Sequence, residues 1–469
     1  MQLVQVPEGF ILGASASAEQ TEGWSGKKPG QDSFMDAWFQ REPNVWKDRL
    51  GPDVATDFMN RFAEDAALMH EFGITHYRTS INWSRFYTDY EQGIVDEEYA
   101  AHIDAVIDAL LAAGVEPMLC LQHYELPQEL FDRYDGWSSR HVVELFARYA
   151  RDAFDRFGDR VKTWFTFNEP VVVPTHIFLD GGAWPHRPGE TGTWLLWNYH
   201  KVLATARAVQ EFEEGGYEGR IGCIINIHLA YPRSSSERDR EAAHLFDLFY
   251  NRIYLDPLIK GVYPSEIVEI CAEHGIEVAF DEDDLAVIAN HTIQYLGVNS
   301  YFPQRVCAPR FVRHPEEPFA PDMLYDEYRL PGCEMNFSRG WEIYPPIMYD
   351  IAHYLLDNYG RIPWVVTENG MGVEGEEAFL NECGIVQDDY RIDFVSRHMS
   401  QLIKAVEEGA PCEGYMLWSF TDCISPRNAF KNRYGYVRVD PKDGFKRIPK
   451  KSAYWHKRLA ESRTLLVAQ

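Results

Sequence analysis

Short apolar runs rich in β-branched residues alternate along this chain with longer segments of helical period. In the longer segments 53–73, 96–114, 138–158 and 390–409, apolar residues recur at i, i+3, i+4 and i+7, and each segment ends at a glycine, as helices commonly do. The pattern therefore predicts helices there. It predicts strands in the short runs, which are residues 10–16, 75–81, 116–122, 161–167, 221–227, 295–300, 364–367 and 415–420.

This alternation also indicates how the elements are arranged. Eight strands that alternate with helices are typical of a parallel sheet, and eight is the number that closes a (β/α) barrel. The runs are apolar on both faces, as in strands buried between a filled interior and an outer ring of helices. No linker or abrupt change of composition divides the chain. We therefore predict an α/β fold: a single (β/α)8 TIM barrel domain over 1–469, with elaborated loops, notably 168–220 and 301–363, around a pocket at the carboxyl-end face.

Composition and charge exclude several classes of protein. With 45% apolar and 14% aromatic residues, the chain is too hydrophobic to be disordered. No stretch approaches the roughly 18 uninterrupted apolar residues of a membrane helix. Lys and Arg number 45 against 72 Asp and Glu, a net charge of −27 that repels nucleic acid and anionic membranes. We expect neither as a partner. The run DEDD (281–284) is typical of a helix start and SSSERDR (234–240) of a solvated loop.

The cysteines and the start of the chain indicate a compartment. Eight cysteines are scattered without a C-x-x-C pair, and several, such as Cys120 and Cys223, lie inside apolar runs. Buried free thiols in a reducing compartment explain this pattern better than disulfides or zinc. The first residues lack the basic and long apolar regions of a signal peptide. We therefore expect a cytoplasmic protein.

Two acidic side chains follow apolar runs in the same local context. The segments VKTWFTFNEP (161–170) and WVVTENG (364–370) each end in a Glu with an Asn beside it, followed by residues that stop a strand. If both runs are barrel strands, Glu169 and Glu368 project from the carboxyl-end face, where barrel active sites form. Each alone could be a structural residue that caps a loop. The repeated context favours a catalytic pair.

A pair of carboxylates without a metal-type cluster indicates glycoside cleavage. One carboxyl donates a proton to the departing oxygen while the other attacks the anomeric carbon. A barrel that binds sugar without cleaving it is an alternative from a different class. A metal-dependent hydrolase is a third, although no H-x-H, H-E-x-x-H or Asp/His cluster lies at the strand ends. The sequence indicates no metal and no cofactor, and a small-molecule glycoside as the partner.

At these motifs the chain resembles glycoside hydrolase family 1, the β-glucosidase and 6-phospho-β-glycosidase family, over essentially its whole length. TFNEP with TENG at this separation is the most specific signal. The motifs that carry the resemblance are FILGASASAEQTEG (10–23), YRTSINWSR (77–85), LQHYELP (121–127), TFNEP (166–170), GVNSY (297–301), GWEIYP (340–345), TENG (367–370), LWSFTD (417–422) and RYGYVRVD (433–440).

The resemblance implies a retaining double displacement. Matched motif to motif, Glu169 would be the general acid/base and Glu368 the nucleophile. Arg78 and Tyr301 would support Glu368 and hold it anionic. Retention also implies that the two carboxyl groups lie roughly 5–5.5 Å apart.

The resemblance also implies how the sugar is held. Hydroxyl groups need donors and acceptors together, which amide and imidazole side chains supply. Trp418 would stack on the sugar, and Trp341 would line the side of the leaving group. The polar positions that match sugar-binding residues of the family are Gln20, His123, Asn168 and Asn299.

The sequence departs from the family's ordinary β-glucosidases after LWSFTD. Those enzymes carry a Glu-Trp pair that binds the 4- and 6-hydroxyls, whereas Ser425 and Pro426 stand here. The 6-phospho enzymes of the family make the Glu-to-Ser exchange and add a Lys and a Tyr that hold the phosphate. Tyr434 fits, but Asn432 falls on the Lys position and Lys431 lies one residue earlier.

Further basic residues surround this segment and could offset the acidic background, namely Arg433, Arg438, Lys442, Lys446 and Arg447. A solvated surface hairpin would carry the same charges. The resemblance places 6-phospho-β-glucosides or galactosides ahead of unphosphorylated or otherwise modified β-glycosides, with Ser425, Lys431 and Tyr434 as the phosphate contacts. It leaves gluco or galacto preference, the aglycone and the oligomeric state open.

Overall fold

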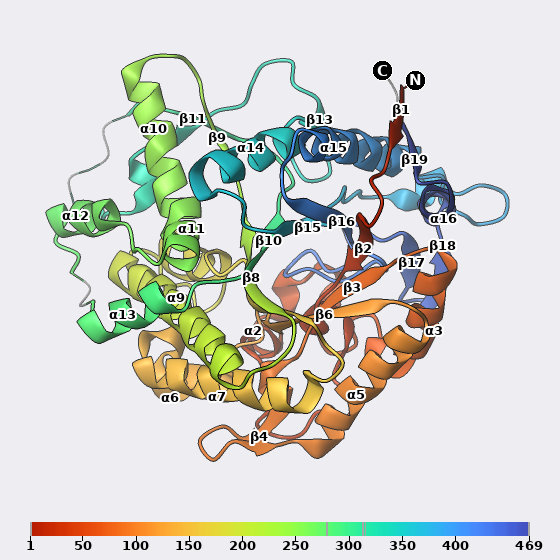
Figure 1. The fold of residues 1–469 in the computed structure, drawn as a ribbon, viewed down its shortest axis with the longest axis horizontal. Helices are drawn as coiled ribbons and strands as arrows, with labels where there is room; N and C mark the ends of the chain where they lie inside the picture. Colours follow the sequence, from red (N-terminus) through yellow and green to blue (C-terminus); the bar gives the residue numbers. More distant parts are fainter. Residues whose placement is uncertain (1, 278–279, 312–313, 315, 468–469) are drawn as a thin grey trace.

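Eight parallel strands close into a barrel in which each strand neighbours the next one along the chain (Figure 1). The computed structural model describes residues 2–277, 280–311, 314 and 316–467. The predicted (β/α)8 architecture is confirmed, and every predicted strand overlaps a barrel strand. The barrel strands are β2 (Ile11–Ser15), β3 (His76–Ser80), β6 (Glu116–Gln122), β7 (Thr163–Asn168), β8 (Arg220–Asn226), β10 (Tyr295–Asn299), β15 (Trp364–Asn369) and β16 (Cys412–Trp418).

A helix precedes the return of the chain to each next strand, and Figure 1 shows these helices around the strands. The four predicted helices are all present. The first begins at Phe58 rather than at residue 53, because Asp57 adopts a left-handed φ of 58°, which does not continue into a right-handed helix. The outer helices are α3 (Phe58–Glu71), α5 (Glu97–Ala112), α7 (Arg140–Phe157), α9 (Thr191–Glu214), α13 (Glu282–Asn290), α14 (Ile347–Tyr359), α15 (Asp389–Glu407) and α16 (Lys451–Ser462).

Apolar side chains fill the inside of the barrel. At its amino end, the Arg220 guanidinium pairs with Glu413 at 2.7 Å and stacks on the Tyr295 ring at 3.5 Å from its centroid. A filled interior leaves the carboxyl ends of the strands as the place for a site. The buried interior cluster consists of Ile11, Met118, Cys120, Phe165, Ile224, Tyr295, Val365 and Met416.

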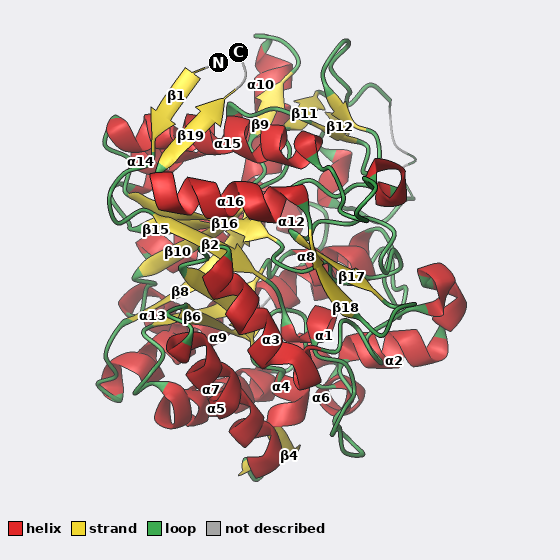
Figure 2. Ribbon diagram, turned by 90° about the vertical axis from the view of Figure 1, so that its right-hand side faces the viewer, coloured by secondary structure: helices red, strands yellow, loops and turns green. Residues whose placement is uncertain are grey.

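Short strands and helices decorate the barrel. Strands β1 (Gln2–Gln5) and β19 (Thr464–Val467) pair and bring the two described ends of the chain side by side (Figures 1 and 2). Figure 2 shows the hairpin of β17 (Val437–Asp440) and β18 (Lys446–Pro449) at the same end of the barrel as α1 and α8. The remaining strands and α-helices are β4 (Tyr87–Asp89), β5 (Ile94–Val95), β9 (Ala230–Pro232), β11 (Gln304–Cys307), β12 (Asp326–Glu327), β13 (Met335–Asn336), β14 (Trp341–Glu342), α1 (Ala18–Thr21), α2 (Phe34–Arg41), α4 (Trp83–Phe86), α6 (Gln128–Tyr134), α8 (Val172–Pro174), α10 (Glu237–Asp247), α11 (Ile253–Leu255) and α12 (Ser265–Glu273).

The two charged runs differ in outcome. The DEDD run begins α13 as predicted, with the Asp281 side chain accepting a hydrogen bond from the Asp283 amide at 2.8 Å. The prediction of a loop for SSSERDR is wrong, because α10 begins inside it. The Ser236 hydroxyl accepts a hydrogen bond from the Asp239 amide at 3.2 Å and so caps the helix. The polar residues around it show no apolar period from which a helix could be predicted.

All eight cysteines carry free thiols, and six of them are buried. Cys333 is half-buried and Cys383 is exposed, so the expectation of buried thiols holds for the other six. Within the described part of the chain, no helix is long and apolar enough to cross a membrane. The assignment of 1–469 to a single domain stays a prediction.

Candidate active site

Glu169 and Glu368 lie at the same end of the barrel, on strands that leave the core there. Glu169 is the first residue after β7, has a φ of 46°, and its amide donates a hydrogen bond to the Ile224 carbonyl of β8 at 2.9 Å. Glu368 is part of β15 and pairs in register with Asn299 of β10. The backbone therefore places both carboxyls on the same rim of the barrel, as the sequence predicted.

Both carboxylate oxygens of Glu368 have protein partners. The Arg78 guanidinium, fully buried in the middle of β3, donates to Oε1 through Nη2. The Tyr301 hydroxyl donates to Oε2 at 2.7 Å. The structure thus brings together three of the four residues expected to act at the reacting carbon.

The protonation of Glu368 differs from our expectation. Burial raises the pKa of Glu368 to about 7, although the Arg78 charge and the Tyr301 hydrogen bond oppose that rise. The nearby charge of Glu169 adds to it. We expected the cation to hold this carboxyl anionic, but its 4% exposure makes loss of hydration the largest effect.

Glu169 is half-buried and is held by two different donors. Asn299 Nδ2 lies 2.9 Å from Oε1, and the Tyr124 hydroxyl lies 2.7 Å from Oε2. Tyr124 was not among the predicted site residues. Its only signal was its place directly after His123 in LQHYELP, where the sequence does not show which way the ring points.

Asn299 needs a correction. We expected its amide to contact the sugar, but the residue is fully buried and its side chain is used by protein partners. Nδ2 donates to Asn168 Oδ1 at 3.1 Å as well as to Glu169, and Oδ1 accepts from the Thr367 hydroxyl at 2.7 Å. Asn299 therefore orients the side chains beside it.

His123 and Asn168 present two donors side by side. Arg78 Nη1 lies 3.1 Å from His123 Nδ1, and a guanidinium only donates, so the ring proton is on Nε2. Burial, together with the Arg78 charge, lowers the pKa of His123 well below its usual value, so the ring is neutral. Nε2 lies 3.2 Å from Asn168 Nδ2, whose orientation Asn299 determines. Two donors this close can share an acceptor such as a sugar hydroxyl oxygen.

Trp418 and Gln20 flank these donors. The Trp418 indole stacks on the His123 ring with centroids 5.9 Å apart and planes 15° apart. The Arg78 guanidinium lies 5.7 Å from the centroid of the Trp418 ring. Gln20 is tied down by the protein, because Nε2 donates to the Ile424 carbonyl at 2.7 Å and Oε1 accepts from the Ser17 hydroxyl at 2.8 Å. Its link to Ile424 places it next to Ser425.

Gly370, after Glu368, is required by close packing. A Cβ at this position would overlap the Trp418 carbonyl oxygen. The Asn-Gly pair read from the sequence as a strand breaker therefore lets β15 approach β16 beneath the site.

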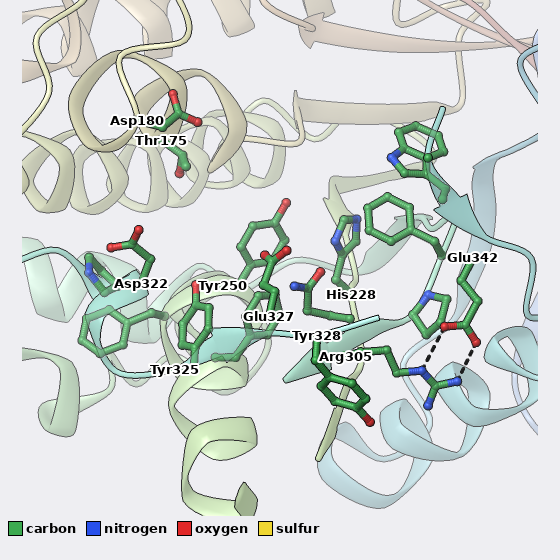
Figure 3. A pocket seen from close by; sticks show the side chains of 18 of the residues that line it. Thr175, Asp180, His228, Tyr250, Arg305, Asp322, Tyr325, Glu327, Tyr328 and Glu342 are labelled. Carbon is green, nitrogen blue, oxygen red and sulfur yellow. Dashed lines mark hydrogen bonds and ion pairs between the residues drawn. The ribbon is translucent and has the colours of Figure 1, made fainter. Parts of the chain in front are cut away.

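Trp341 lies between the catalytic residues and a large cavity. Its ring is 5.5 Å from that of Tyr301 and stacks on Phe302 at 4.8 Å. The cavity beyond it measures about 720 Å³ and is lined by both aromatic and charged side chains. Figure 3 shows Tyr250, His228 and Glu327 on one side of this space and the Arg305–Glu342 ion pair at one end. This arrangement suits the leaving-group side predicted for Trp341.

The three residues expected at the phosphate are not all together. Tyr434 is buried and packs with Trp418 and Cys423, next to Tyr301 and Trp341. Ser425 is half-buried in a turn closed by hydrogen bonds with Ala429. Lys431 is on the outside, 38% exposed, with its amine 3.5 Å from Glu374 Oε2.

The basic neighbourhood expected around this segment is largely neutralised by protein carboxylates. Arg433 pairs with Asp422 at 3.0 Å, Arg438 with Asp440 at 2.6 Å, and the buried Arg447 with Asp65 at 2.8 Å. These three cations stabilise the fold rather than present charge to a ligand.

A buried ionic network supports the same segment. Asp422 is fully buried and accepts from Lys450 at 2.9 Å and from Arg433 at 3.0 Å. Although burial raises the pKa of Asp422, Lys450 and Arg433 lower it below its usual value. Arg391 adds hydrogen bonds to the carbonyls of Met371 at 2.5 Å and Tyr434 at 2.9 Å. The loops after β15 and β16 are thereby joined.

Among the residues that the structure describes, no group of three or more His, Cys, Asp or Glu side chains is arranged to hold a metal ion.

Comparisons with known proteins agree with this geometry. The model of glycosyl hydrolase family 1 matches residues 2–465. The chain is 41% identical over 455 residues to 6-phospho-beta-glucosidase GmuD of Bacillus subtilis (strain 168), with 97% of each chain covered. It is 31% identical to Beta-glucosidase A of Acetivibrio thermocellus, over 98% of this chain and 99% of that protein. A solved family 1 b-glucosidase from Thermotoga maritima matches with a TM-score of 0.89 and 30% identity, over 98% of this chain and 99% of that one. The chain belongs to glycosyl hydrolase family 1.

Proposed function

We propose that this family 1 enzyme hydrolyses small-molecule β-glycosides by double displacement, with Glu368 as the nucleophile and Glu169 as the general acid/base. The observation that carries the assignment is the difference between the two carboxyls. Glu368 is contacted by a buried cation, Arg78, and by the Tyr301 hydroxyl. Glu169 is held by the neutral donors Asn299 and Tyr124 and is the more exposed of the two.

These environments divide the chemistry between the two residues. In the first step a Glu368 oxygen attacks the anomeric carbon while Glu169 gives its proton to the departing oxygen. The ester formed at Glu368 has no charge, so Glu169 can then take a proton from the water that attacks the same carbon, and the bond from that carbon to Glu368 breaks to release the carboxylate. Two inversions at one centre leave the anomeric configuration retained.

The Glu368→Gln variant tests this assignment against a barrel that only binds sugar. An amide cannot form the glycosyl ester, so we expect kcat on p-nitrophenyl β-glycosides to fall at least about 1,000-fold. Proton NMR of the parent reaction should show the β-anomer as the first sugar product. Equal hydrolysis by variant and parent would refute the enzymatic assignment, and the α-anomer as first product would refute retention.

The preferred substrate under this proposal carries a phosphate on O6 of the sugar. Ser425 stands where ordinary β-glucosidases of the resembled family carry a glutamate. The absence of that glutamate removes a negative charge that would repel a phosphate. The relative from Bacillus subtilis is named a 6-phospho-beta-glucosidase. The alternative is an unphosphorylated β-glucoside, and the relative from Acetivibrio thermocellus is named a beta-glucosidase.

A paired assay separates these substrates. p-Nitrophenyl β-glucoside, β-galactoside and their 6-phosphates would be compared by kcat/KM under one buffer and ionic strength. We expect higher values for a phosphorylated sugar. A large preference for the unphosphorylated pair would reject the phosphate and leave the glycosidase assignment intact.

The free thiols are in keeping with action in the cytoplasm, where phosphorylated sugars would be available as substrates.

A further inference from the structure

Arg339 is a cation beside the site that no carboxylate of the described chain neutralises. It precedes β14, in the turn between β13 and β14, and its guanidinium lies 4.2 Å from the centroid of the Trp341 ring. Its Nε is buried and has no hydrogen-bond partner among the described residues. Unpaired buried donors on a charged group are costly unless a ligand uses them.

The two acidic side chains within five residues of Arg339 are already paired. Glu342 on the same hairpin makes a bidentate pair with Arg305, at 3.0 and 2.7 Å. Glu334 pairs in the same way with Arg397, at 3.0 and 2.7 Å. Arg339 therefore keeps its positive charge available in a protein whose net charge is −27.

Arg339 also reaches the segment that carries Ser425 and Tyr434. With the Asn432 amide oriented so that both of its ends are satisfied, its oxygen accepts from Arg339 Nη1 at 3.2 Å and its nitrogen donates to the Ser338 carbonyl at 3.2 Å. Asn432 occupies the position at which the resembled 6-phospho enzymes carry their lysine. A cation from a different loop thus lies next to that position.

Tyr434 lies within the electrostatic reach of this guanidinium. Burial raises the pKa of Tyr434 to about 12, and the Arg339 charge is the strongest effect that opposes the rise. Tyr434 keeps its proton at neutral pH and can donate it in a hydrogen bond. Its hydroxyl makes no hydrogen bond to the protein within the described ranges, whereas its carbonyl accepts from Arg391.

We propose that Arg339 is the residue that selects an anionic substrate: its guanidinium binds the 6-phosphate of the sugar together with the Tyr434 hydroxyl, in the place of Lys431. The inference rests on the proposed 6-phospho-β-glycosidase function and names the residue that would produce that preference. A guanidinium that lies over an indole can present parallel N–H groups to a phosphate, which a lysine cannot. Lys431, exposed and beside Glu374, contributes little to this contact.

The test replaces the cation and compares substrates that differ only in the phosphate. Arg339→Gln, Arg339→Lys and Lys431→Gln would be assayed on p-nitrophenyl β-glucoside and its 6-phosphate. Arg361→Gln is the charge-matched control, because Arg361 is exposed and lies before β15, at the opposite end of the barrel. Glucose 6-phosphate and glucose would be compared as competitive inhibitors of each protein.

For Arg339→Gln we expect kcat/KM to fall about 10- to 100-fold on the phosphorylated substrate, as for loss of a charged hydrogen bond, and to change less than about threefold on the other. Inhibition by glucose 6-phosphate should weaken in parallel, and Arg339→Lys should recover part of both losses. Arg361→Gln should keep the preference of the parent.

The remaining outcomes separate this inference from the proposed function. If the parent prefers the phosphorylated sugar and Arg339→Gln retains that preference, Arg339 is excluded and the function stands. Selective loss in Lys431→Gln instead would lead to the same conclusion. Equal losses on both substrates would show that Arg339 only supports Trp341. A parent without preference for phosphate would overturn both the proposed phosphate preference and the role of Arg339, and would leave the glycosidase assignment intact.

Discussion

Asn299 Nδ2 lies 2.9 Å from Glu169 Oε1, and this hydrogen bond joins the ends of two barrel strands that are not neighbours. β8 lies between β7, which precedes Glu169, and β10, which ends at Asn299. Asn299 also pairs in register with Glu368. The Asn299 side chain thus holds the Glu169 carboxyl, while the Asn299 backbone pairs with the strand that carries Glu368.

Replacing Asn299 with alanine should therefore misplace Glu169. We expect kcat to fall about 100-fold, the effect of a misaligned catalytic group. The proton from Glu169 matters most when the leaving group is a poor one. The loss of kcat should therefore be greater for an alkyl β-glycoside than for a dinitrophenyl β-glycoside, whose leaving group needs little protonation. Similar losses on both would show that Asn299 supports the barrel and not proton transfer. Circular dichroism and the melting temperature would be recorded alongside.

The pH dependence should reflect the buried nucleophile. Glu368 attacks only when ionised, and burial raises its pKa to about 7, so kcat/KM should increase as the pH rises through about 7. Tyr301→Phe removes a hydrogen bond that lowers this pKa and should move the acid limb to higher pH. Tyr454→Phe, at an exposed position on α16, is the matched control. An acid limb below pH 5 in the parent would show that the Arg78 ion pair outweighs burial.

Removing the charge of Asp422 should destabilise the loops after β15 and β16. Asp422→Asn leaves the buried Lys450 and the half-buried Arg433 without their shared carboxylate, and breaking such a buried pair costs about 3–5 kcal/mol. The free energy of unfolding in urea would measure this. Asp443→Asn removes the same charge at an exposed position and should change stability by less than about 0.5 kcal/mol. Equal effects of the two changes would count against the network.

Gly370→Ala should impair activity and stability together. The added Cβ overlaps the Trp418 carbonyl oxygen, so the backbone next to Glu368 or the strand that carries Trp418 must move. Overpacking of this kind costs about 1–3 kcal/mol, and the displaced nucleophile should lower kcat at least about tenfold. Gly192→Ala is the control, because its Cβ would meet only Ile276 Cγ2 at an ordinary 3.7 Å. Full activity in Gly370→Ala would contradict the close approach.

The sequence predicted most of the fold because barrel strands and their helices have different periods, and period is a local property. The segment 161–167 reads as apolar on both faces and overlaps β7, and 138–158 has the spacing of a helix and contains α7. SSSERDR failed for the same reason, since a polar helix start has no apolar period to detect.

The carboxyl pair could also be predicted, because two strand ends carried the same Glu–Asn–breaker context and parallel strands end on one rim of a barrel. Side-chain partners could not. Asn299 lies inside a motif that indicates sugar contact, but its amide is taken by Asn168, Glu169 and Thr367. From the sequence, Arg433 is a cation that could bind a phosphate, whereas in the structure it pairs with Asp422.

By itself, then, the sequence determined the barrel, the two glutamates at its rim and the family, since these depend on the order and type of residues along the chain. Only the tertiary structure decided the surroundings of each charge: burial that raises the pKa of Glu368, donors that hold Glu169, and a carboxylate beside Lys431 but none beside Arg339 in the described chain. The physical reason is that hydration and Coulomb energies depend on distances between residues far apart in the sequence, which folding alone sets.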